Sequence, residues 1–176
     1  MNFDQRYTYN RKTDTLGGGG FGTVYKAYDN FEKTFVAIKL LTTSTDERYD
    51  LRAEIMRTKR LSHDNLCRYF NLDQKSTKVD EEIELHDVII MEYIPGGPID
   101  KYLQKHPQHR DKVLKDVIKG LRYLHKNGII HRDISPSNIL VDDTGAQPVA
   151  KIIDFGISKE VNREHSISSQ LIGKPQ

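Results

Sequence analysis

Apolar and β-branched residues recur in the first part of the chain with the short period that is typical of strands. Residues 23–29 (TVYKAYD) and 34–41 (TFVAIKLL) are rich in β-branched and aromatic side chains, and the polar DNFEK segment between them is typical of a turn. The pattern therefore predicts strands up to about residue 42.

Beyond residue 42 the period changes to that of a helix. Ser44 and Glu47 form a capping-box signal at its start. The residues that then fall on one helical face are Leu51, Glu54, Ile55 and Thr58. Glu54 is an acid within an apolar stripe, where an unpaired charge would be costly, so the pattern also predicts a cation near it.

Strand-like and helical segments alternate further along the chain. The polar, acidic segment 76–86 predicts a solvated hairpin, and the apolar run 87–94 (DVIIMEYI) predicts a buried strand that ends at the PGGP loop, residues 95–98. An amphipathic helix follows and ends at the C-cap signal Asn127–Gly128. Its apolar stripe consists of Leu114, Val117, Ile118, Leu121 and Leu124.

The pattern returns to short strands near the end of the chain. Residues 138–141 (NILV) and 149–156 (VAKIIDFG) flank the polar turn DDTGAQ, and the serine-rich tail 158–176 predicts a mobile loop. The chain thus has a strand-rich half with one helix, a Gly/Pro hinge and a helical half. We expect an α+β fold with a cleft where the two halves meet.

Composition narrows the class of protein. The 176 residues include 36% hydrophobic and 30% charged residues, which suits a soluble globular chain of one domain or two small lobes. A net charge of +2 does not favour nucleic acid as a partner. No apolar run has membrane-spanning length, and the N-terminal segment lacks the apolar core of a signal peptide. Cys67 is the only cysteine, so no internal disulfide is possible and a reducing, cytoplasmic location is expected.

A glycine-rich segment, LGGGGFGTV, places Gly17, Gly19 and Gly22 in a G-x-G-x-x-G-x-V arrangement. Glycines let a backbone approach a phosphate closely, although four consecutive glycines are also typical of a flexible linker. A strand follows instead of the helix that a Rossmann fingerprint requires, and no Gly-Lys-Ser/Thr closes the run as in a P-loop. The remaining interpretation is a glycine loop that joins two antiparallel strands and covers a nucleotide.

Lys39 and Glu54 form a candidate ion pair. Lys39 lies in the apolar strand segment VAIK, where the ordinary alternative is a solvated surface lysine. A buried Glu54 needs a cation, and Lys39 is the obvious candidate. A lysine held by such a pair could bind the phosphates of a nucleotide.

Three further polar residues point to phosphoryl transfer. Asp133 and Asn138 lie in HRDISPSN, and Asp154 lies in IIDFG. Two oxygen-bearing side chains could hold Mg²⁺, and a third carboxylate could accept a proton from an alcohol. Each aspartate alone is also typical of a turn or a cap, but the succession HRD-x4-N and then DFG is highly specific.

These motifs, in this order, resemble those of eukaryotic-type protein kinases, both of the Ser/Thr type and of their bacterial relatives. The resemblance covers essentially the whole chain. It implies a two-lobe kinase fold with an N-lobe over 1–94, a hinge over 95–98 and a partial C-lobe over 99–176. It also implies ATP and Mg²⁺ as cofactors and protein serine and threonine hydroxyls as acceptors.

The resemblance implies a role for each matching residue. Lys39 would hold the α- and β-phosphates and pair with Glu54, and Asp133 would act as the catalytic base. Asn138 and Asp154 would complete the catalytic set as the Mg²⁺ ligands. The residues implied in nucleotide binding are Leu16, Gly17, Gly19, Gly22, Val24, Ala37, Lys39, Met91, Glu92, Ile94 and Leu140. Met91 would be the gatekeeper, and backbone groups of Glu92 and Ile94 would bind adenine.

The segment around the DFG motif also has implied regulatory residues. Arg132 would bind a phosphorylated activation loop. The candidate phosphoacceptors, including sites of autophosphorylation, are Ser166, Ser168 and Ser169.

The chain departs from the family pattern at two linked positions. Ser135 stands where Ser/Thr-specific members carry a lysine, and Lys174 stands where they carry a threonine. One hypothesis is a swap in which the Lys174 ammonium takes the place beside Asp133 that the missing lysine would fill. The other is that Ser135 simply makes a weaker enzyme, and the sequence favours neither.

Smaller departures bear on affinity and regulation. Pro98 replaces a side chain that often binds ribose, and Thr58 replaces an apolar residue that links the lobes. The chain also ends before any APE motif, so we expect an incomplete catalytic domain with part of the long helix exposed. The alternative functions are a nucleotide-binding, pseudokinase-like module without turnover and, less favoured by the motifs, a small-molecule kinase.

Overall fold

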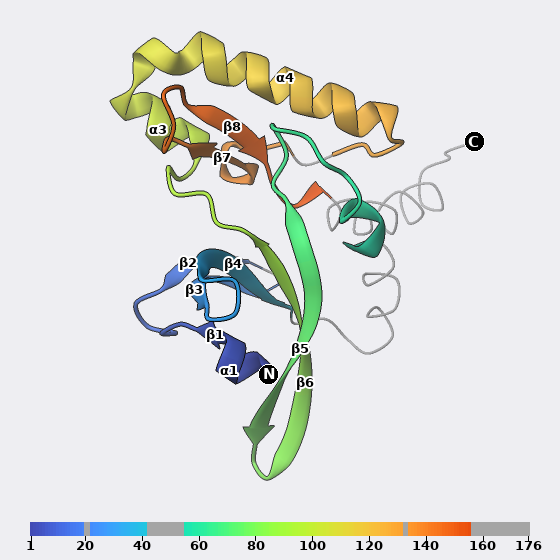
Figure 1. Cartoon of the computed structure of the whole chain (residues 1–176). Helices are drawn as coiled ribbons and strands as arrows, with labels where there is room; N and C mark the ends of the chain where they lie inside the picture. The colour runs from blue at the N-terminus through green and yellow to red at the C-terminus, as the bar shows by residue number, and fades with distance from the viewer. Residues whose placement is uncertain (20–21, 42–54, 132–133, 156–176) are drawn as a thin grey trace, which may run out of the picture. The chain divides into compact units, whose positions relative to one another are not determined.

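The computed structural model describes residues 1–19, 22–41, 55–131 and 134–155. These residues form two compact units. The first unit comprises Met1–Arg60 and Arg68–Tyr93, and the second comprises Leu61–Cys67 and the described part of Ile94–Gln176. Strands and helices occur in the order shown in Figure 1, which confirms the predicted α+β class.

The first unit is built on an antiparallel sheet of six strands, as far as the described residues show. The order is β1-β3-β4-β6-β5, and β2 pairs with β3 beside β1. The strands are β1 (Tyr7–Thr8), β2 (Thr15–Gly19), β3 (Gly22–Asp29), β4 (Thr34–Leu41), β5 (Tyr69–Val79) and β6 (Glu82–Glu92). The predicted strands around TVYKAYD, TFVAIKLL and DVIIMEYI are therefore confirmed.

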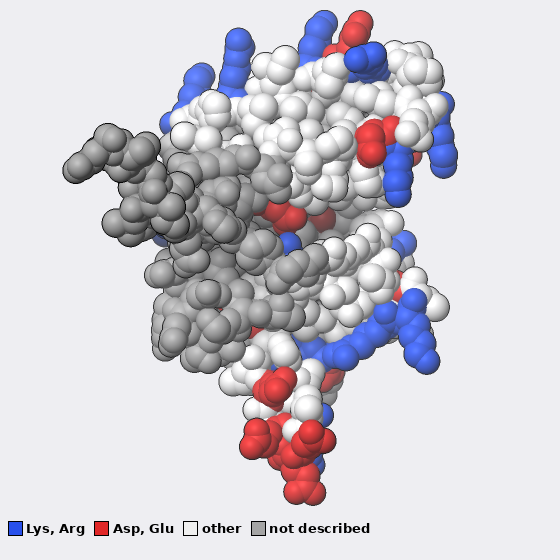
Figure 2. Space-filling view, turned by 180° about the vertical axis from the view of Figure 1, so that it is seen from behind, with Lys and Arg blue, Asp and Glu red and all other residues white. Residues whose placement is uncertain are grey.

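The hairpin of β5 and β6 contains the predicted acidic segment at its tip. Its two strands of 11 residues each extend beyond the rest of the sheet (Figure 1). Asp80 and Glu81 make the turn with φ angles of 47° and 70°, a left-handed geometry that favours glycine in most proteins. Acidic side chains gather around this tip in Figure 2. The hairpin is solvated there, as predicted.

The first residues form a short helix, α1 (Phe3–Arg6), so the strand predicted for this segment is wrong. Asn2 caps the helix: its side chain accepts a hydrogen bond from the Gln5 N–H at 2.9 Å, and the Gln5 side chain accepts one from the Asn2 N–H at 3.0 Å. This reciprocal cap stabilises a helical turn that is too short to show a periodic pattern.

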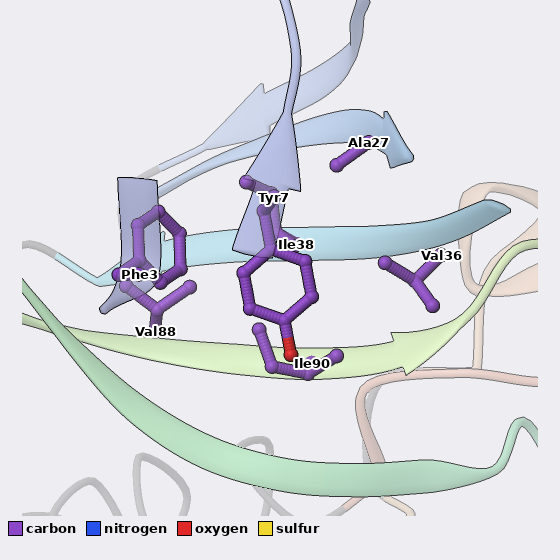
Figure 3. Packing of buried hydrophobic residues seen from close by; sticks show 7 residues of the cluster. All are labelled: Phe3, Tyr7, Ala27, Val36, Ile38, Val88 and Ile90. Atoms are coloured by element: carbon purple, nitrogen blue, oxygen red, sulfur yellow. The ribbon is translucent and has the colours of Figure 1, made fainter. Parts of the chain in front are cut away.

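Helix α1 and strand β1 cover one face of the sheet with aromatic side chains. Phe3 and Tyr7 pack there with ring centroids 5.1 Å apart. Both belong to the hydrophobic cluster shown in Figure 3, which consists of Phe3, Tyr7, Ala27, Val36, Ile38, Val88 and Ile90. We call this the covered face of the sheet. Its residues come from four strands and α1, which explains why the N-terminal segment is ordered against the sheet.

The helix predicted after residue 42 is described only at residues 55–58, where the chain is helical. Ile55 and Thr58 are buried, as their place in the stripe predicts. The Thr58 hydroxyl donates a hydrogen bond to the Ile55 carbonyl at 2.9 Å, which satisfies a polar group in a buried position. The predicted cap at Ser44 and Glu47 lies outside the described residues.

The second unit combines helices with a two-stranded sheet. Its elements are α3 (Ile99–Lys105), the 3-10 turn η1 (Pro107–His109), α4 (Arg110–Lys126), the 3-10 turn η2 (Pro136–Asn138), β7 (Ile139–Asp142) and β8 (Val149–Ile152). The predicted C-cap is confirmed, because Asn127 and Gly128 close α4 and Gly128 has a φ of 75°. The strand expected over 149–156 ends earlier, at Ile152, because Asp154 adopts a left-handed φ of 57° that a strand cannot continue.

Helix α4 packs its predicted stripe only in part. Val117 and Leu124 are buried, together with Val113. In contrast, Leu114 and Ile118 are 43% and 54% exposed, so part of the apolar face is open as expected. Within the described parts of the chain, none of the helices has both the length and the apolar character needed to cross a bilayer.

Candidate active site

The glycine-rich segment forms the end of β2 and the start of β3. Gly22 has a φ of 148°, and a Cβ at this position would lie 1.8 Å from the Leu40 carbonyl oxygen in β4. A Cβ at Gly17 would meet nothing within 4 Å. Gly22 is therefore required by the packing of the strands, whereas Gly17 leaves open space that could admit a ligand. Gly19 pairs with Gly22 across the turn, and residues 20–21 lie outside the described residues.

Four residues predicted to bind nucleotide project from one face of the sheet. Val24 pairs with Lys39 between β3 and β4, and Ala37 pairs with Met91 between β4 and β6. Directly paired residues share a face, as do residues two apart on one strand. Ala37 and Lys39 are two apart, so all four side chains lie on one face, opposite the covered face that carries Ile38.

Lys39 is buried on that face. Its side chain and backbone together are 7% exposed, and the flanking Ala37 and Met91 are each 5% exposed. The alternative interpretation of Lys39 as a solvated surface lysine is therefore wrong. A buried ammonium requires compensating polar groups, which is the setting expected for a functional lysine.

Hydrogen bonds at the end of β6 limit which backbone group of Glu92 could bind adenine. The Glu92 N–H donates to the Arg68 carbonyl at 2.9 Å, and the Glu92 carboxylate accepts from the Arg68 N–H at 3.1 Å. A backbone contact from Glu92 to adenine could thus involve only its carbonyl oxygen. Leu16, in β2, is 49% exposed.

In the second unit, the Gly/Pro segment runs alongside β7. The Gly96 N–H donates to the Val141 carbonyl at 2.8 Å, and the Val141 N–H donates to the Gly97 carbonyl at 3.0 Å. A Cβ at Gly96 would lie 2.1 Å from the same Val141 oxygen, so only glycine allows this approach. The pairing holds this segment next to Leu140 of β7, which forms a bridge with Pro98. Ile94, which precedes the segment, is buried.

Backbone hydrogen bonds tie the Asn138 segment to the residue before Asp154. The Ile153 N–H donates to the Asn138 carbonyl at 2.9 Å. The Ile153 carbonyl accepts a hydrogen bond from the His131 side chain, with the ring Nε2 at 3.0 Å. Both polar groups of Ile153 are thus held, which fixes the backbone from which Asp154 projects. Asp154 itself is left-handed, a conformation that is uncommon for residues other than glycine and that is concentrated at functional sites.

The side chains of Asn138 and Asp154 carry oxygen atoms of the kind that bind a hard cation. Asn138 offers a carboxamide oxygen and Asp154 a carboxylate, and Mg²⁺ prefers such oxygen ligands while retaining water and phosphate as the others. Ser135 donates to or accepts from the Ser137 hydroxyl at 2.8 Å. A hydroxyl supplies no positive charge, so Ser135 lacks the charge of the lysine that the resemblance implies at this position.

Sequence reasoning missed a buried clamp that holds β8. The Asp116 carboxylate of α4 accepts a hydrogen bond from the Ala150 N–H at 3.1 Å, and the Asn65 side-chain amide donates to the Ala150 carbonyl at 3.0 Å. The Ile152 N–H then donates to the Asn65 carbonyl at 3.0 Å. The clamp positions the strand that leads directly to Asp154. The signal available in the sequence was an aspartate next to Val117 in the apolar part of α4.

Several predicted residues fall where the structure is not described. The Lys39–Glu54 pair, the base at position 133 and the proposed swap at position 174 therefore stay predictions. The residues concerned are Glu54, Arg132, Asp133, Ser166, Ser168, Ser169 and Lys174.

Comparison with known proteins agrees with the motifs. The family model described as "Protein kinase domain" matches residues 10–175. Mitogen-activated protein kinase kinase kinase 3 of Arabidopsis thaliana is 35% identical over 164 residues, which cover 86% of this chain and 24% of that protein. Mitogen-activated protein kinase kinase kinase A of Dictyostelium discoideum is 33% identical over 181 residues, 94% of this chain and 18% of that protein.

A third relative is named as a probable serine/threonine-protein kinase of Dictyostelium discoideum. It is 31% identical over 167 residues, 91% of this chain and 25% of its own length. The chain thus spans about a quarter or less of the length of these curated relatives.

Proposed function

Because this chain belongs to the protein kinase domain family, we propose that the protein containing it transfers the γ-phosphate of ATP to serine and threonine hydroxyls of protein substrates. The Ser/Thr preference rests on the resemblance to serine/threonine kinases and on relatives with such names. The resemblance also implies a protein substrate, and the near-neutral net charge and the single cysteine support the further proposals of no nucleic acid partner and a reducing, cytoplasmic location.

The arrangement around Ile153 is the observation that carries the proposal most strongly. Hydrogen bonds to His131 and Asn138 hold the backbone of Ile153 from both sides, and the next residue, Asp154, has a left-handed backbone conformation. A held backbone restricts where the Asp154 carboxylate can lie before any ligand binds, and left-handed residues are concentrated at functional sites, which supports a metal-binding role.

The residues would divide the chemistry as follows. Mg²⁺, held by Asn138 and Asp154, would neutralise charge on the phosphate oxygens. Lys39 would place its ammonium on the α- and β-phosphates, and its burial strengthens that attraction. Asp133 would accept the proton of the attacking hydroxyl.

Phosphate transfer by the longest natural polypeptide that carries this chain tests the proposal. We expect transfer of labelled phosphate from ATP to a general protein acceptor and to the polypeptide itself, with phosphate recovered on serine or threonine. Asp154→Ala should reduce transfer at least about 100-fold, while Asp143→Ala, an exposed carboxylate in the β7–β8 turn, should retain it. Equal rates for Asp154→Ala and the parent would refute the assignment.

The alternative is a pseudokinase-like module that binds a nucleotide without transferring phosphate, and Ser135, whose hydroxyl forms a hydrogen bond with the Ser137 hydroxyl and supplies no cation, is compatible with it. It predicts nucleotide binding without phosphate transfer in the same experiment.

The variant Lys174→Thr separates the two hypotheses about Ser135, which are a charge swap with Lys174 and a weaker enzyme. A swap requires this variant to lose most of its transfer, whereas unchanged transfer means that Lys174 has no such role.

A further inference from the structure

The exposed side of helix α4 carries a row of cations. Lys115, Lys119, Arg122 and Lys126 are all exposed, and their spacing of four, three and four residues places them on one helical face. Lysine and arginine side chains stand out along the α4 region in Figure 2. We call these four residues the basic row. It extends about 16 Å along the helix axis, at about 1.5 Å per residue.

The basic row lacks an acidic counterpart on its own helix. Among the residues that the structure describes, none of its four members forms an ion pair. The ion pair of α4 joins Lys112 to Asp116, which is buried. Asp111 is exposed one turn before Lys115, and no ion pair joins these two described residues. Like charges three and four residues apart repel one another in a helix, and an anionic partner would relieve this repulsion.

The tip of the β5–β6 hairpin has the opposite charge, and it extends beyond the rest of the sheet (Figure 1). Lys78 is the one cation among residues 78–85. Glu84 lies 3.6 Å from the Nε2 atom of His86, which offsets its charge only when the ring is protonated. The exposed acids of the tip are Asp80, Glu81, Glu82 and Glu84. This acidic tip therefore carries a net negative charge that complements the basic row.

The two surfaces also match in the spacing of their charges. Glu82 and Glu84 are two apart on one strand, so their side chains project from one face of the hairpin, about 7 Å apart. Neighbouring cations of the basic row are about 6 Å apart on the helix surface. Two carboxylates of the tip can therefore meet two successive cations of the row at the same time.

Each charged surface has an exposed apolar neighbour. Val79 pairs with Glu82 across the hairpin, so its side chain projects from the same face, where it is 47% exposed. Ile118 lies one helical turn from Lys115 and from Arg122 and is 54% exposed. Contact between the two surfaces would remove both apolar side chains from water, which is favourable.

We propose that the acidic tip of one molecule docks on the basic row of a second copy of the same chain. Glu82 and Glu84 would pair with cations of the row, and Val79 would lie against Ile118. A second copy is the partner because the chain itself supplies the surface of complementary charge and spacing. The two surfaces differ, so each molecule in a pair keeps one of them available, and assembly continues to longer chains or a closed ring. This inference does not depend on phosphate transfer.

Sedimentation velocity of the 176-residue chain over a range of concentrations tests the assembly. We expect species larger than a dimer to form as the concentration rises, because the contact joins two different surfaces. Added salt should weaken the association, because the paired groups are exposed charges.

Charge reversal identifies the two surfaces. Lys115→Glu combined with Lys119→Glu should weaken association at least about ten-fold, and so should Glu82→Lys combined with Glu84→Lys. A chain that carries all four substitutions should associate again, because the attraction is restored with the signs exchanged. A thermal melt of each variant shows that it is folded before its association is interpreted.

The matched control reverses two cations of α3. Lys101 and Lys105 are exposed in the same unit, and Lys101→Glu combined with Lys105→Glu makes the same change in net charge without touching the basic row. This control should associate like the parent.

Several results would overturn the proposal. These are a parent that stays monomeric at every concentration, an equal loss of association in the α3 control, and a chain with all four substitutions that does not associate. A monomeric parent that instead binds phosphatidylserine vesicles through the basic row would assign the row to a membrane surface. Asp154→Ala should associate like the parent, so failure of phosphate transfer is distinguishable from failure of this assembly.

Discussion

Replacement of Asp116 by alanine tests how the fold positions the backbone before Asp154. The Asp116 carboxylate is buried in α4 and accepts a hydrogen bond from the Ala150 N–H in β8 at 3.1 Å. The same carboxylate pairs with Lys112, one helical turn earlier. Removing the carboxylate leaves the Ala150 N–H, in a residue that is 1% exposed, without this acceptor.

The expected cost follows from the burial of each partner. A hydrogen bond to a charged acceptor contributes about 1.5–3 kcal/mol to stability, and a buried donor left without an acceptor costs a similar amount. Both numbers describe the loss of the same hydrogen bond, so they are not added. The Lys112 side chain is 36% exposed and can turn to water, so losing it as a partner costs little. We therefore expect Asp116→Ala to destabilise the second unit by about 2–3 kcal/mol.

Urea unfolding and amide hydrogen exchange measure this cost. With a typical urea dependence of about 2 kcal/mol per molar, the unfolding midpoint should fall by roughly 1–1.5 M. Exchange of the Ala150 amide hydrogen should accelerate in the variant. Asp111→Ala in the first turn of the same helix is the control, because Asp111 is exposed and should cost less than about 1 kcal/mol. Equal midpoints for Asp116→Ala and Asp111→Ala would refute the clamp.

Three further predictions concern the first unit. Gly22→Ala should destabilise it by at least about 3 kcal/mol in urea unfolding because of its backbone clash, whereas Gly17→Ala should cost less than about 1 kcal/mol. Burial raises the pKa of Asp29, but hydrogen bonds from the Arg6 side chain and from two backbone N–H groups outweigh burial and hold this pKa below the ordinary 3.8. The lowered pKa of Asp29 predicts stabilisation that is present above about pH 4 and is lost at lower pH. Asp29→Asn should therefore flatten the fall in unfolding free energy between about pH 5 and pH 3. An equally steep fall in that variant would contradict this prediction. Tyr7→Phe should raise the unfolding free energy by about 1 kcal/mol, because a buried hydroxyl without a partner is removed. Burial raises the pKa of Tyr7 to about 12, so the parent should also lose stability above pH 10, and more than Tyr7→Phe does.

The local sequence pattern predicted much of the first unit, because the sheet is regular and one of its two faces is covered. Ala37 and Lys39 are two apart in β4, so strand geometry alone places them on one face, whereas the pairing that adds Val24 to this face is known only from the structure. The glycine arrangement was equally informative, although its close packing against β4 becomes visible only in the structure.

Features that depend on distant residues were not predictable. Helix α1 is a single turn, and it depends on its reciprocal cap and on the packing of Phe3 against the sheet. The clamp joins Asp116, Asn65 and Ala150, which are far apart in the sequence. The left-handed geometry of Asp154 likewise becomes visible only in the structure.

The proposed function requires both Lys39 and Asp154 to take part in magnesium-dependent ATP binding. Calorimetric titration of ATP with and without Mg²⁺ tests this requirement, with the parent, Lys39→Met and Asp154→Asn compared in the longest natural polypeptide. We expect that Mg²⁺ strengthens ATP binding to the parent, that Asp154→Asn removes most of this strengthening, and that Lys39→Met weakens binding with Mg²⁺ present. Magnesium dependence that is unchanged in Asp154→Asn, or ATP affinity that is unchanged in Lys39→Met, would contradict it.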